Sequence, residues 1–337
     1  MERRHAYQFE ARGTTGITQA EPESNLHAPS RMTARYDVAI VGGGPAGLCA
    51  ALWLARYLHK VVVVDSGDPR NWPTRAINGY MGHLGIRPVE LRALGRKEGG
   101  EHGVEYIDGI VDEAIDETGE LFRIKLREGS VIEARRILLA IGIKDVWPDI
   151  PGLDRCYGET VHVCPDCDGF ETRDKKTVVV GKGRKAVGMA LALTTWTRKI
   201  VICTNGEKPD MDQQLLDQLT ALNIPVLDQP IKCVVSQSGE ITGVDLDGAM
   251  SLDCERLYFA IGQYPSDDLG AQLGCKRDEL GRLVIDDRNH TSVKNVYAAG
   301  DIAPGPQTAI FAAASGAVAA TAIHASLVPD SRKLPAV

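Results

Sequence analysis

The sequence has few aromatic residues and no apolar run long enough to cross a membrane without interruption. Aromatic residues make up 5% of the 337 residues, and a bilayer-spanning helix needs about 20 consecutive, mostly apolar residues. The nearest match is TAIFAAASGAVAATAI at residues 308–323, which is rich in alanine and interrupted by serine and glycine. We therefore expect a buried helix there and no association with a membrane.

An excess of positive charge is also missing. The chain has 38 Lys and Arg against 45 Asp and Glu, a net charge of −7, whereas nucleic-acid-binding surfaces are basic. This balance argues against a nucleic-acid partner. Arg3 and Arg4 are not followed by the apolar segment of a signal peptide. We expect residues 1–35 to form a polar N-terminal arm and the protein to be cytoplasmic.

The cysteines form only one closely spaced pair, Cys164 and Cys167 in CPDCDG. A structural zinc site needs four ligands, but the chain has no second CxxC, and Cys156 and His162 are the only nearby candidates. We expect His162 to be a surface or packing residue and no metal to bind. Because cytosolic thiols are kept reduced, a cytosolic CxxC is usually catalytic or sensing. The pair is therefore predicted to be redox-active rather than a static disulfide.

Glycine, in contrast, is abundant, with 35 residues. From residue 36, YDVAIVGGGPAGLCAALWLARYLHKVVVVDSG indicates an apolar strand, a glycine turn, a helix and a second strand, the pattern of a parallel sheet covered on both faces. Gly42, Gly44 and Gly47 match the G-x-G-x-x-G turn that brings a helix N-terminus to a pyrophosphate. Asp65 ends the second strand, where a carboxylate accepts from ribose hydroxyls. A dinucleotide site is predicted here.

A second unit of the same kind begins at KKTVVVGKGRKAVGMALALTTWTRKIVICTNG. Its glycine turn contains Gly181, Gly183 and Ala186 and is followed by a helix and another apolar strand. At the end of that strand an acid selects NADH, and an arginine accommodates the 2′-phosphate of NADPH. The chain has Thr204 and Asn205 there. The fold of this unit is predicted, and its binding of a pyridine nucleotide is left open.

The order of these units predicts an α/β fold with two Rossmann-like, three-layer domains, the second inserted into the first. The stretches ILLAIGIKDVWPDIPG (137–152) and LYFAIGQYPS (257–266) flank the second unit, and SVKNVYAAGD returns to the first. The expected boundaries are 36–153 and 289–330 for the first domain, 154–288 for the second, and 331–337 for a C-terminal tail. The crossovers near 150 and 288 are candidate hinges.

The ordered set GGGPAG, CxxCDG, a second GxGxxA and AAGD…Q resembles the low-molecular-weight thioredoxin reductases, which are class II FAD-dependent pyridine nucleotide-disulfide oxidoreductases. The resemblance covers residues 36–327 and implies a homodimer with FAD in the first domain. The residues it implies around FAD are Gly42, Gly44, Pro45, Ala46, Gly47, Asp65, Asn78, Ala140, Gly142, Gly300, Asp301, Gln307 and Thr308. The family's Arg-Gln-Ala is Pro306-Gln307-Thr308 here, so any role of that arginine is lost.

The same resemblance implies the roles of the cysteine pair. Cys167 would accept electrons from the flavin, and Cys164 would attack the substrate disulfide. A helix N-terminus lowers the pKa of a thiol in such motifs, and the thiolate is the attacking species in exchange. Asp168 is interpreted as the general acid that protonates the leaving thiolate. The alternative is that Asp168 is a helix N-cap.

The chain departs from the family at the electron donor, because CTNGEKPD stands where typical members have an arginine-rich segment. Two subgroups share that loss: the deeply rooted thioredoxin reductases of photosynthetic microbes, which we take as the closer resemblance, and dithiol oxidases, which carry CxxCHG. Asp168 in place of that histidine favours the reductases. Gly181, Gly183 and Ala186 would then form a vestigial NAD(P)H site.

We therefore expect a flavin-dependent disulfide reductase with an atypical or lost NADPH site. It would pass electrons from FAD through Cys164 and Cys167 to a thioredoxin-like protein. NADPH, NADH, a reduced ferredoxin or a dithiol are the candidate donors. Two alternatives stay open: an FAD-dependent dithiol oxidase that uses oxygen, and a non-catalytic flavin redox sensor.

Overall fold

The computed structural model of the protein describes residues 34–334. The expected N-terminal arm lies outside the described residues, apart from its last two positions. Ala34 and Arg35 are not part of an arm, because they begin strand β1 (Ala34–Val41) and pair with Ile132 and Glu133. The first strand therefore starts before the apolar run that marks it in the sequence.

The first sheet is seven-stranded, in the order β3-β2-β1-β6-β5-β4, with β17 paired to β6. Strands β1, β2, β3, β6 and β17 are parallel, whereas β4, β5 and β6 form an antiparallel meander. The bounds are β2 Val61–Asp65, β3 Glu105–Asp108, β4 Val111–Asp116, β5 Phe122–Leu126, β6 Val131–Leu139 and β17 Val296–Ala298. Strand β2 is buried along its whole length, as expected for a parallel strand covered on both faces.

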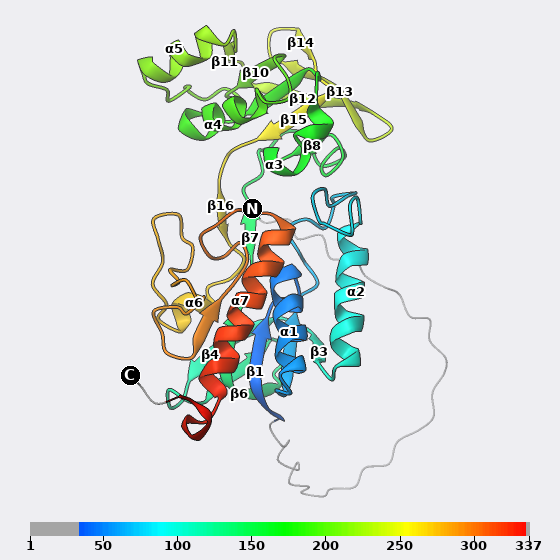
Figure 1. Ribbon diagram of the computed structural model, residues 1–337. Helices are drawn as coiled ribbons and strands as arrows, with labels where there is room; N and C mark the ends of the chain where they lie inside the picture. The colour runs from blue at the N-terminus through cyan, green and yellow to red at the C-terminus, as the bar shows by residue number, and fades with distance from the viewer. Residues whose placement is uncertain (1–33, 335–337) are drawn as a thin grey trace, which may run out of the picture. The chain divides into compact units, whose positions relative to one another are not determined.

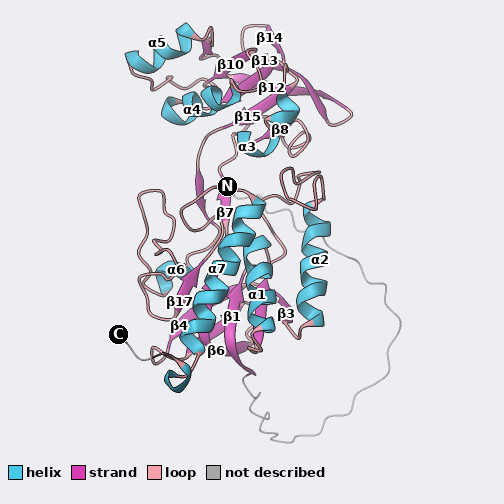
Figure 2. Cartoon of the chain, in the orientation of Figure 1, coloured by secondary structure: helices cyan, strands magenta, loops and turns pink. Residues whose placement is uncertain are grey.

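Three helices lie side by side over one face of this sheet: α1 (Pro45–Arg56), α2 (Pro88–Glu101) and α7 (Ala309–Leu327) (Figures 1 and 2). Helices α1 and α7 approach closely, since a Cβ on Gly316 would lie 2.1 Å from the Ala46 carbonyl oxygen. Small side chains along both helices allow this contact.

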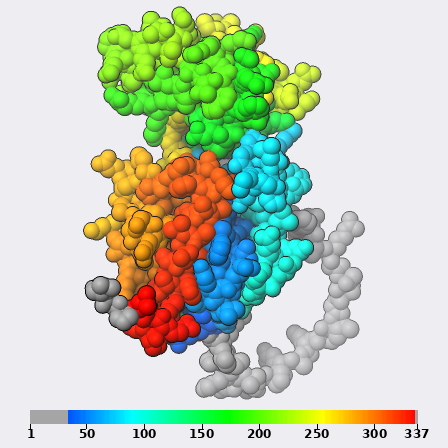
Figure 3. Space-filling model, viewed as in Figure 1, coloured from blue at the N-terminus to red at the C-terminus, as the bar shows by residue number. Residues whose placement is uncertain are grey.

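Helix α7 contains the alanine-rich stretch, and among the described residues it is long and apolar enough to span a membrane by length and composition. The predicted burial holds for one side of the helix: Ala312, Ala319, Ala320 and Ile323 pack into the core shared with α1. The other side is at the surface (Figure 3), where Val318 is 43% exposed. The predicted burial is therefore confirmed for one side of α7 and wrong for the other.

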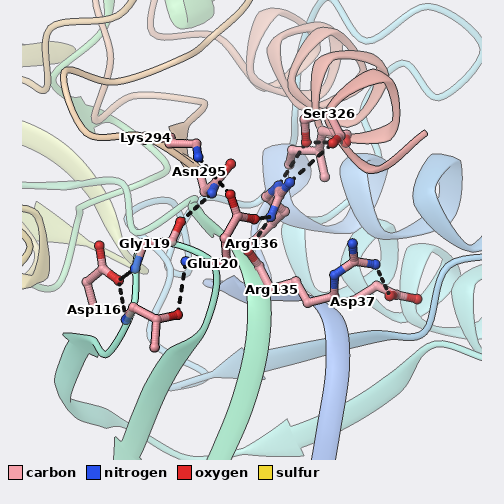
Figure 4. Close-up of polar contacts among 11 residues, drawn as sticks. Asp37, Asp116, Gly119, Glu120, Arg135, Arg136, Lys294, Asn295 and Ser326 are labelled. Carbon is pink, nitrogen blue, oxygen red and sulfur yellow. Dashed lines mark hydrogen bonds and ion pairs between the residues drawn. The ribbon is translucent and has the colours of Figure 1, made fainter. Parts of the chain in front are cut away.

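A polar network joins the two separate parts of the chain that build this sheet (Figure 4). The buried Arg136 of β6 donates to the Ser326 hydroxyl at the end of α7 (2.9 Å) and pairs with Glu120 (3.2 Å). Lys294 pairs with Glu120 at 2.7 Å, and Asn295 donates to the Gly119 carbonyl at 2.6 Å. The returning C-terminal segment is thereby attached to β5 and β6.

The second sheet is five-stranded and parallel, in the order β11-β10-β9-β15-β8. Its strands are β8 Val161–His162, β9 Thr177–Val180, β10 Ile200–Cys203, β11 Val226–Leu227 and β15 Arg256–Phe259. Its helices are α3 Pro165–Asp168, η1 Phe170–Thr172, α4 Gly183–Leu193 and α5 Gln213–Ala221. An antiparallel meander follows: β12 Ile231–Gln237, β13 Glu240–Leu246 and β14 Met250–Asp253. The predicted α/β fold with two Rossmann-like domains, the second inserted into the first, is confirmed.

The return from the second sheet to the first differs from the prediction. Strands β7 (Ile143–Asp145) and β16 (Gln263–Pro265) pair antiparallel where the chain crosses. After β16, residues of and around the short helix α6 (Leu269–Gln272), including Leu269 and Leu283, pack in the core of the first sheet. The expected boundary at 288 is thus displaced, because these apolar side chains are buried against the first sheet. The last helix, η2 (Asp330–Arg332), reaches into the expected tail.

Candidate active site

The glycine turn after β1 is held by two close backbone approaches. Gly42 has φ +107°, and a Cβ there would lie 2.2 Å from the Ala140 carbonyl oxygen. A Cβ on Gly47 would lie 1.9 Å from the Gly42 carbonyl oxygen, whereas Gly44 faces open space. Helix α1 begins at Pro45, after an N-cap glycine that gives no side-chain hydrogen bond. Its first N–H groups therefore need an external acceptor, which an anion supplies.

Asp65 lies at the end of β2, as predicted, but it already has a charged partner. Its Oδ1 accepts from the Gly67 N–H (3.2 Å), and its Oδ2 is paired with Arg92 of α2. Arg92 also donates to the Gly43 carbonyl (3.2 Å). No sequence motif marks Arg92, because it belongs to an ordinary helical pattern. It adds a positive charge beside the glycine turn.

Arg70, in the DPRN segment after β2, joins three groups that are distant in the sequence. It forms a bidentate pair with Asp145 (2.6 and 2.8 Å) and donates to Asp301 (3.1 Å) and Gln307 (2.9 Å). Burial raises the pKa of Asp301, and the nearby guanidinium of Arg70 opposes that rise. The sequence prediction included Asp301 and Gln307 and omitted Arg70 and Asp145.

One cavity brings together most of the predicted site residues. Those that line it are Gly42, Gly44, Pro45, Ala46, Asp65, Asn78, Ala140, Gly142, Cys164, Cys167, Asp168, Gly300, Asp301, Gln307 and Thr308. Gly47 is not among its lining residues and instead packs beneath the turn. The cavity thus runs from the glycine turn to the CxxC. Lining residues that the sequence prediction missed include Arg70, Tyr157 and His162.

The two cysteines of CPDCDG are joined in a disulfide, with their Cα atoms 5.3 Å apart. Cys164 is the N-cap of α3, and its sulfur accepts from the Cys167 N–H (3.2 Å). The side-chain amide of Asn78 donates to the Cys167 carbonyl (3.3 Å). The pair therefore lies at a helix N-terminus, as the motif predicted. Asn78, which belongs to the domain built on the first sheet, lies beside it.

For Asp168 and for His162, the structure excludes one of the two alternatives that the sequence left open. Asp168 is the last residue of α3, so the N-cap alternative is wrong, and its side chain is 15% exposed. His162 is 6% exposed and is therefore not a surface residue. Its Nδ1 lies 3.3 Å from Asp168 Oδ2. The four-residue helix turns the Asp168 side chain toward the strand that carries His162.

The second glycine turn is covered by the segment that follows β10. The N–H of Gly183 donates to the Pro209 carbonyl (2.8 Å), and Lys182 is paired with Glu207. The next basic residue, Arg184, is 3.3 Å from Asp212. Gly181, Gly183 and Ala186 are not among the residues that line the cavity described above. Two of the three basic groups of this turn, Lys182 and Arg184, are thus paired with acidic residues of CTNGEKPD and of the N-cap of α5, whereas Lys185 donates to the Ile261 carbonyl (3.3 Å).

Residues 36–316 match the model of the pyridine nucleotide-disulphide oxidoreductase family. The chain belongs to this family. It is 27% identical over 301 residues to the thioredoxin reductase of Bacillus subtilis, covering 86% of this chain and 94% of that one. A solved Bacillus anthracis structure described as a thioredoxin reductase, TrxB, is 30% identical, with a TM-score of 0.81 and coverage of 87% and 98%. The solved structure of HlmI is 32% identical, with a TM-score of 0.82 and coverage of 88% of this chain and 93% of that one.

Membership of this family makes the chain an oxidoreductase and implies FAD together with a pyridine nucleotide. The glycine turn fits the pyrophosphate of FAD, because Gly44 leaves open the space that a Cβ would fill and α1 presents free N–H groups. In the second turn the Gly183 N–H is already bonded to the Pro209 carbonyl (2.8 Å).

The two glycines Gly44 and Gly47 give a matched test of this cradle. We expect Gly44→Ala to fold with an unchanged thermal midpoint, because its Cβ meets nothing within 4 Å, but to bind FAD about tenfold or more weakly, since the Cβ enters the pyrophosphate space. Gly47→Ala should destabilise the apoprotein itself, by about 1–3 kcal/mol, because its Cβ overlaps backbone. Flavin titration and thermal unfolding of the two apoproteins would show this split, and equal flavin affinity in Gly44→Ala and wild type would contradict it.

Proposed function

We propose that the protein is a flavin-dependent disulfide reductase that passes electrons from FAD through Cys164 and Cys167 to the disulfide of a thioredoxin-like protein. One observation carries the proposal: the disulfide shares a single cavity with the glycine turn and with the AAGD…Q residues. The family and the thioredoxin reductases similar to this chain support the same reaction class. A homodimer and a cytoplasmic location are proposed on the resemblance alone.

FAD, when bound, supplies a store of two electrons beside the disulfide. The turn Gly42–Gly47 and the N-terminus of α1 would hold its pyrophosphate, and Asp65 its adenosine ribose. Asp301 would hold the ribityl side, with Gln307 and Thr308 along the ring system. Arg70 orients this end, because it bonds to both Asp301 and Gln307.

The reduced pair then carries out two exchange steps. The Cys164 thiolate attacks the substrate disulfide, so that one S–S bond breaks and a mixed disulfide forms. The leaving thiolate takes a proton from Asp168, a carboxyl 15% exposed that lines the same cavity as the disulfide. The Cys167 thiolate next attacks Cys164 Sγ, which restores the Cys164–Cys167 disulfide and releases the second substrate thiolate to solvent. Two electrons have passed from the pair to the substrate.

The electron donor is proposed to be something other than NAD(P)H, such as a reduced ferredoxin or a dithiol. Three features support this. Thr204 and Asn205 replace the residue that reads the ribose; the Gly183 N–H is bonded to Pro209; and two of the nearby cations, Lys182 and Arg184, are paired with Glu207 and Asp212. A dinucleotide phosphate would have to break these contacts and would then meet acidic side chains.

An anaerobic titration of the purified flavoprotein tests the donor. We expect one equivalent of NADPH or NADH to leave the flavin absorbance unchanged over minutes, whereas dithionite bleaches it at once. Reduction of a thioredoxin disulfide by the dithionite-reduced protein is the matching positive result. Rapid bleaching by one equivalent of NADPH would overturn the proposed loss of the nucleotide site. It would leave the disulfide reductase activity to be judged on the thioredoxin assay.

The dithiol oxidase is a second candidate, favoured by the same covered turn, because an oxidase also needs no pyridine nucleotide. Its electrons would run the other way, from a substrate dithiol through the cysteine pair and FAD to oxygen. Oxygen consumption on addition of small dithiols, at a rate exceeding thioredoxin reduction, would select it over the reductase.

A further inference from the structure

The His162 imidazole is buried beside the cysteine pair without a complete set of polar partners. The residue is 6% exposed, and among the described residues its Nε2 has no hydrogen-bond partner. Its Nδ1 lies 3.3 Å from Asp168 Oδ2. Buried polar atoms almost always have a hydrogen-bond partner, so a buried imidazole with an unpartnered nitrogen indicates a role for the side chain other than packing. Both His162 and Asp168 line the cavity that contains the disulfide.

The fold holds these two side chains through one tyrosine. His162 of β8 lies opposite Tyr258 of β15 in the parallel register, with ring centroids 5.3 Å apart. The Tyr258 hydroxyl is hydrogen-bonded to that of Thr172 (2.8 Å), and Thr172 donates to the Asp168 carbonyl (3.1 Å). The strand that carries His162 and the helix that carries Asp168 are thus fixed to the same side chain.

We propose that His162 is a positioning residue that holds the Asp168 carboxyl beside the cysteine pair and sets the pH range in which Asp168 delivers its proton. The inference rests on the thiol–disulfide exchange proposed above. In that step the Asp168 O–H bond breaks and an S–H bond forms on the leaving thiolate. The remaining carboxylate is poorly solvated and faces the imidazole, which stabilises it by charge when protonated and exchanges its proton with water.

The other titratable groups around this pair include two phenols, a carboxylate and a guanidinium. Burial raises the pKa of Tyr157 to about 12 and raises that of Tyr258 as well, so both phenols stay neutral. Glu171 and Arg256 are the charged groups that act on the Tyr258 hydroxyl. Apart from the two thiols themselves, the remaining titratable neighbour of Asp168 is the His162 imidazole at 3.3 Å.

The test measures the reactivity of the reduced pair and needs no partner protein. The full chain is reduced, Cys164 is alkylated with iodoacetamide between pH 5 and 9, and the labelled peptide is quantified by mass spectrometry. In His162→Gln the Asp168 carboxylate loses the imidazole that balances its charge when protonated, so the thiolate beside it is disfavoured. We expect the apparent pKa of Cys164 to rise by about one unit, a roughly tenfold slower alkylation at neutral pH.

A double-mutant cycle separates positioning from a general structural effect. In an Asp168→Asn background, the same His162→Gln change should leave the alkylation profile unmoved, because the group through which it acts is gone. His162→Asn, whose amide can occupy the place of Nδ1, should retain Asp168 in position but lose the pH dependence contributed by the imidazole. If His162→Gln fails to fold, the His162→Asn variant provides the same comparison with the wild type.

The exposed pair of His290 and Asp286 (2.9 Å) provides the matched control, and His290→Gln should leave the profile of Cys164 unchanged. An unaltered profile in His162→Gln, or an equal shift with and without Asp168, would overturn the inference. Failure of the proposed function would give a different result. The protein would not reduce thioredoxin, but His162→Gln would still shift the alkylation profile of Cys164 when Asp168 is present and not in Asp168→Asn.

Discussion

Replacing Cys164 by serine is expected to abolish disulfide turnover while leaving flavin binding intact. The attacking species in exchange is a thiolate, and a serine hydroxyl does not ionise at neutral pH. Loss of a nucleophile commonly lowers turnover by several orders of magnitude, so we expect a fall of at least about 10³-fold in thioredoxin reduction. The flavin spectrum and the thermal midpoint should stay close to those of the wild type.

Cys167→Ser should fail in a different way, and this distinguishes the two sulfurs. Cys164 can still attack, but no thiol remains to resolve the mixed disulfide. A covalent adduct between the variant and a thioredoxin-like substrate should accumulate and be visible on a non-reducing gel. Adduct formation in Cys164→Ser instead would reverse the assigned roles.

The other cysteines supply the controls for these variants. Burial raises the pKa of Cys203 and Cys254 to about 12, so these thiols stay protonated and unreactive at neutral pH. Cys233 is half-buried and free, and Cys233→Ser should retain full turnover. A comparable loss in Cys233→Ser would mean that the serine substitutions act through the fold rather than through the chemistry of the pair.

The parts of the site that could be predicted from the sequence are those that one short segment determines. The turn at Gly42 and Gly47 follows from steric contacts within a few residues and with the adjacent strand, so the glycine pattern is diagnostic. The placement of Cys164 at a helix N-terminus is equally local, since the helix begins at the next residue.

The parts that could not be predicted depend on contacts between distant segments. Arg70 meets Asp301 across 231 positions of the chain, and no local pattern reports such a pairing. The N-cap interpretation of Asp168 was wrong because α3 ends at that residue. The boundary at 288 was displaced because Leu269 and Leu283 bury their side chains against the first sheet. The spacing of these apolar residues in the sequence does not show which of the two sheets they pack against.

Arg70→Met is expected to produce the largest loss of stability and of FAD affinity among single substitutions outside the cysteine pair. The side chains of Arg70 and Asp145 are 16% and 5% exposed, and that of Asp301 is 19% exposed. Removing one partner of a buried ion pair leaves an uncompensated charge, which typically lowers the free energy of unfolding by about 3–5 kcal/mol. FAD binding should weaken in parallel, since Arg70 orients Asp301 and Gln307.

The unfolding free energy lost in Arg70→Met should decrease as the pH falls. Burial already raises the pKa of Asp301 above its usual value, and Arg70 opposes that rise, so the variant's Asp301 should titrate higher still. An acid whose pKa is raised in the folded state destabilises the fold above its unfolded pKa, and that penalty disappears as the pH falls. The difference between wild type and Arg70→Met should therefore shrink from pH 8 toward pH 4.

Urea unfolding of the apoproteins at pH 8 and pH 5, followed by flavin titration, measures both effects. Arg75→Met is the matched control: Arg75 is also paired with a glutamate but is 67% exposed, and exposed pairs contribute about 0–1 kcal/mol. Adding Asp145→Asn to Arg70→Met should recover part of the lost stability, because it removes one of the stranded carboxylates. If Arg70→Met loses no more unfolding free energy and no more FAD affinity at pH 8 than Arg75→Met does, the cluster around Arg70 neither stabilises the domain built on the first sheet nor orients the flavin site.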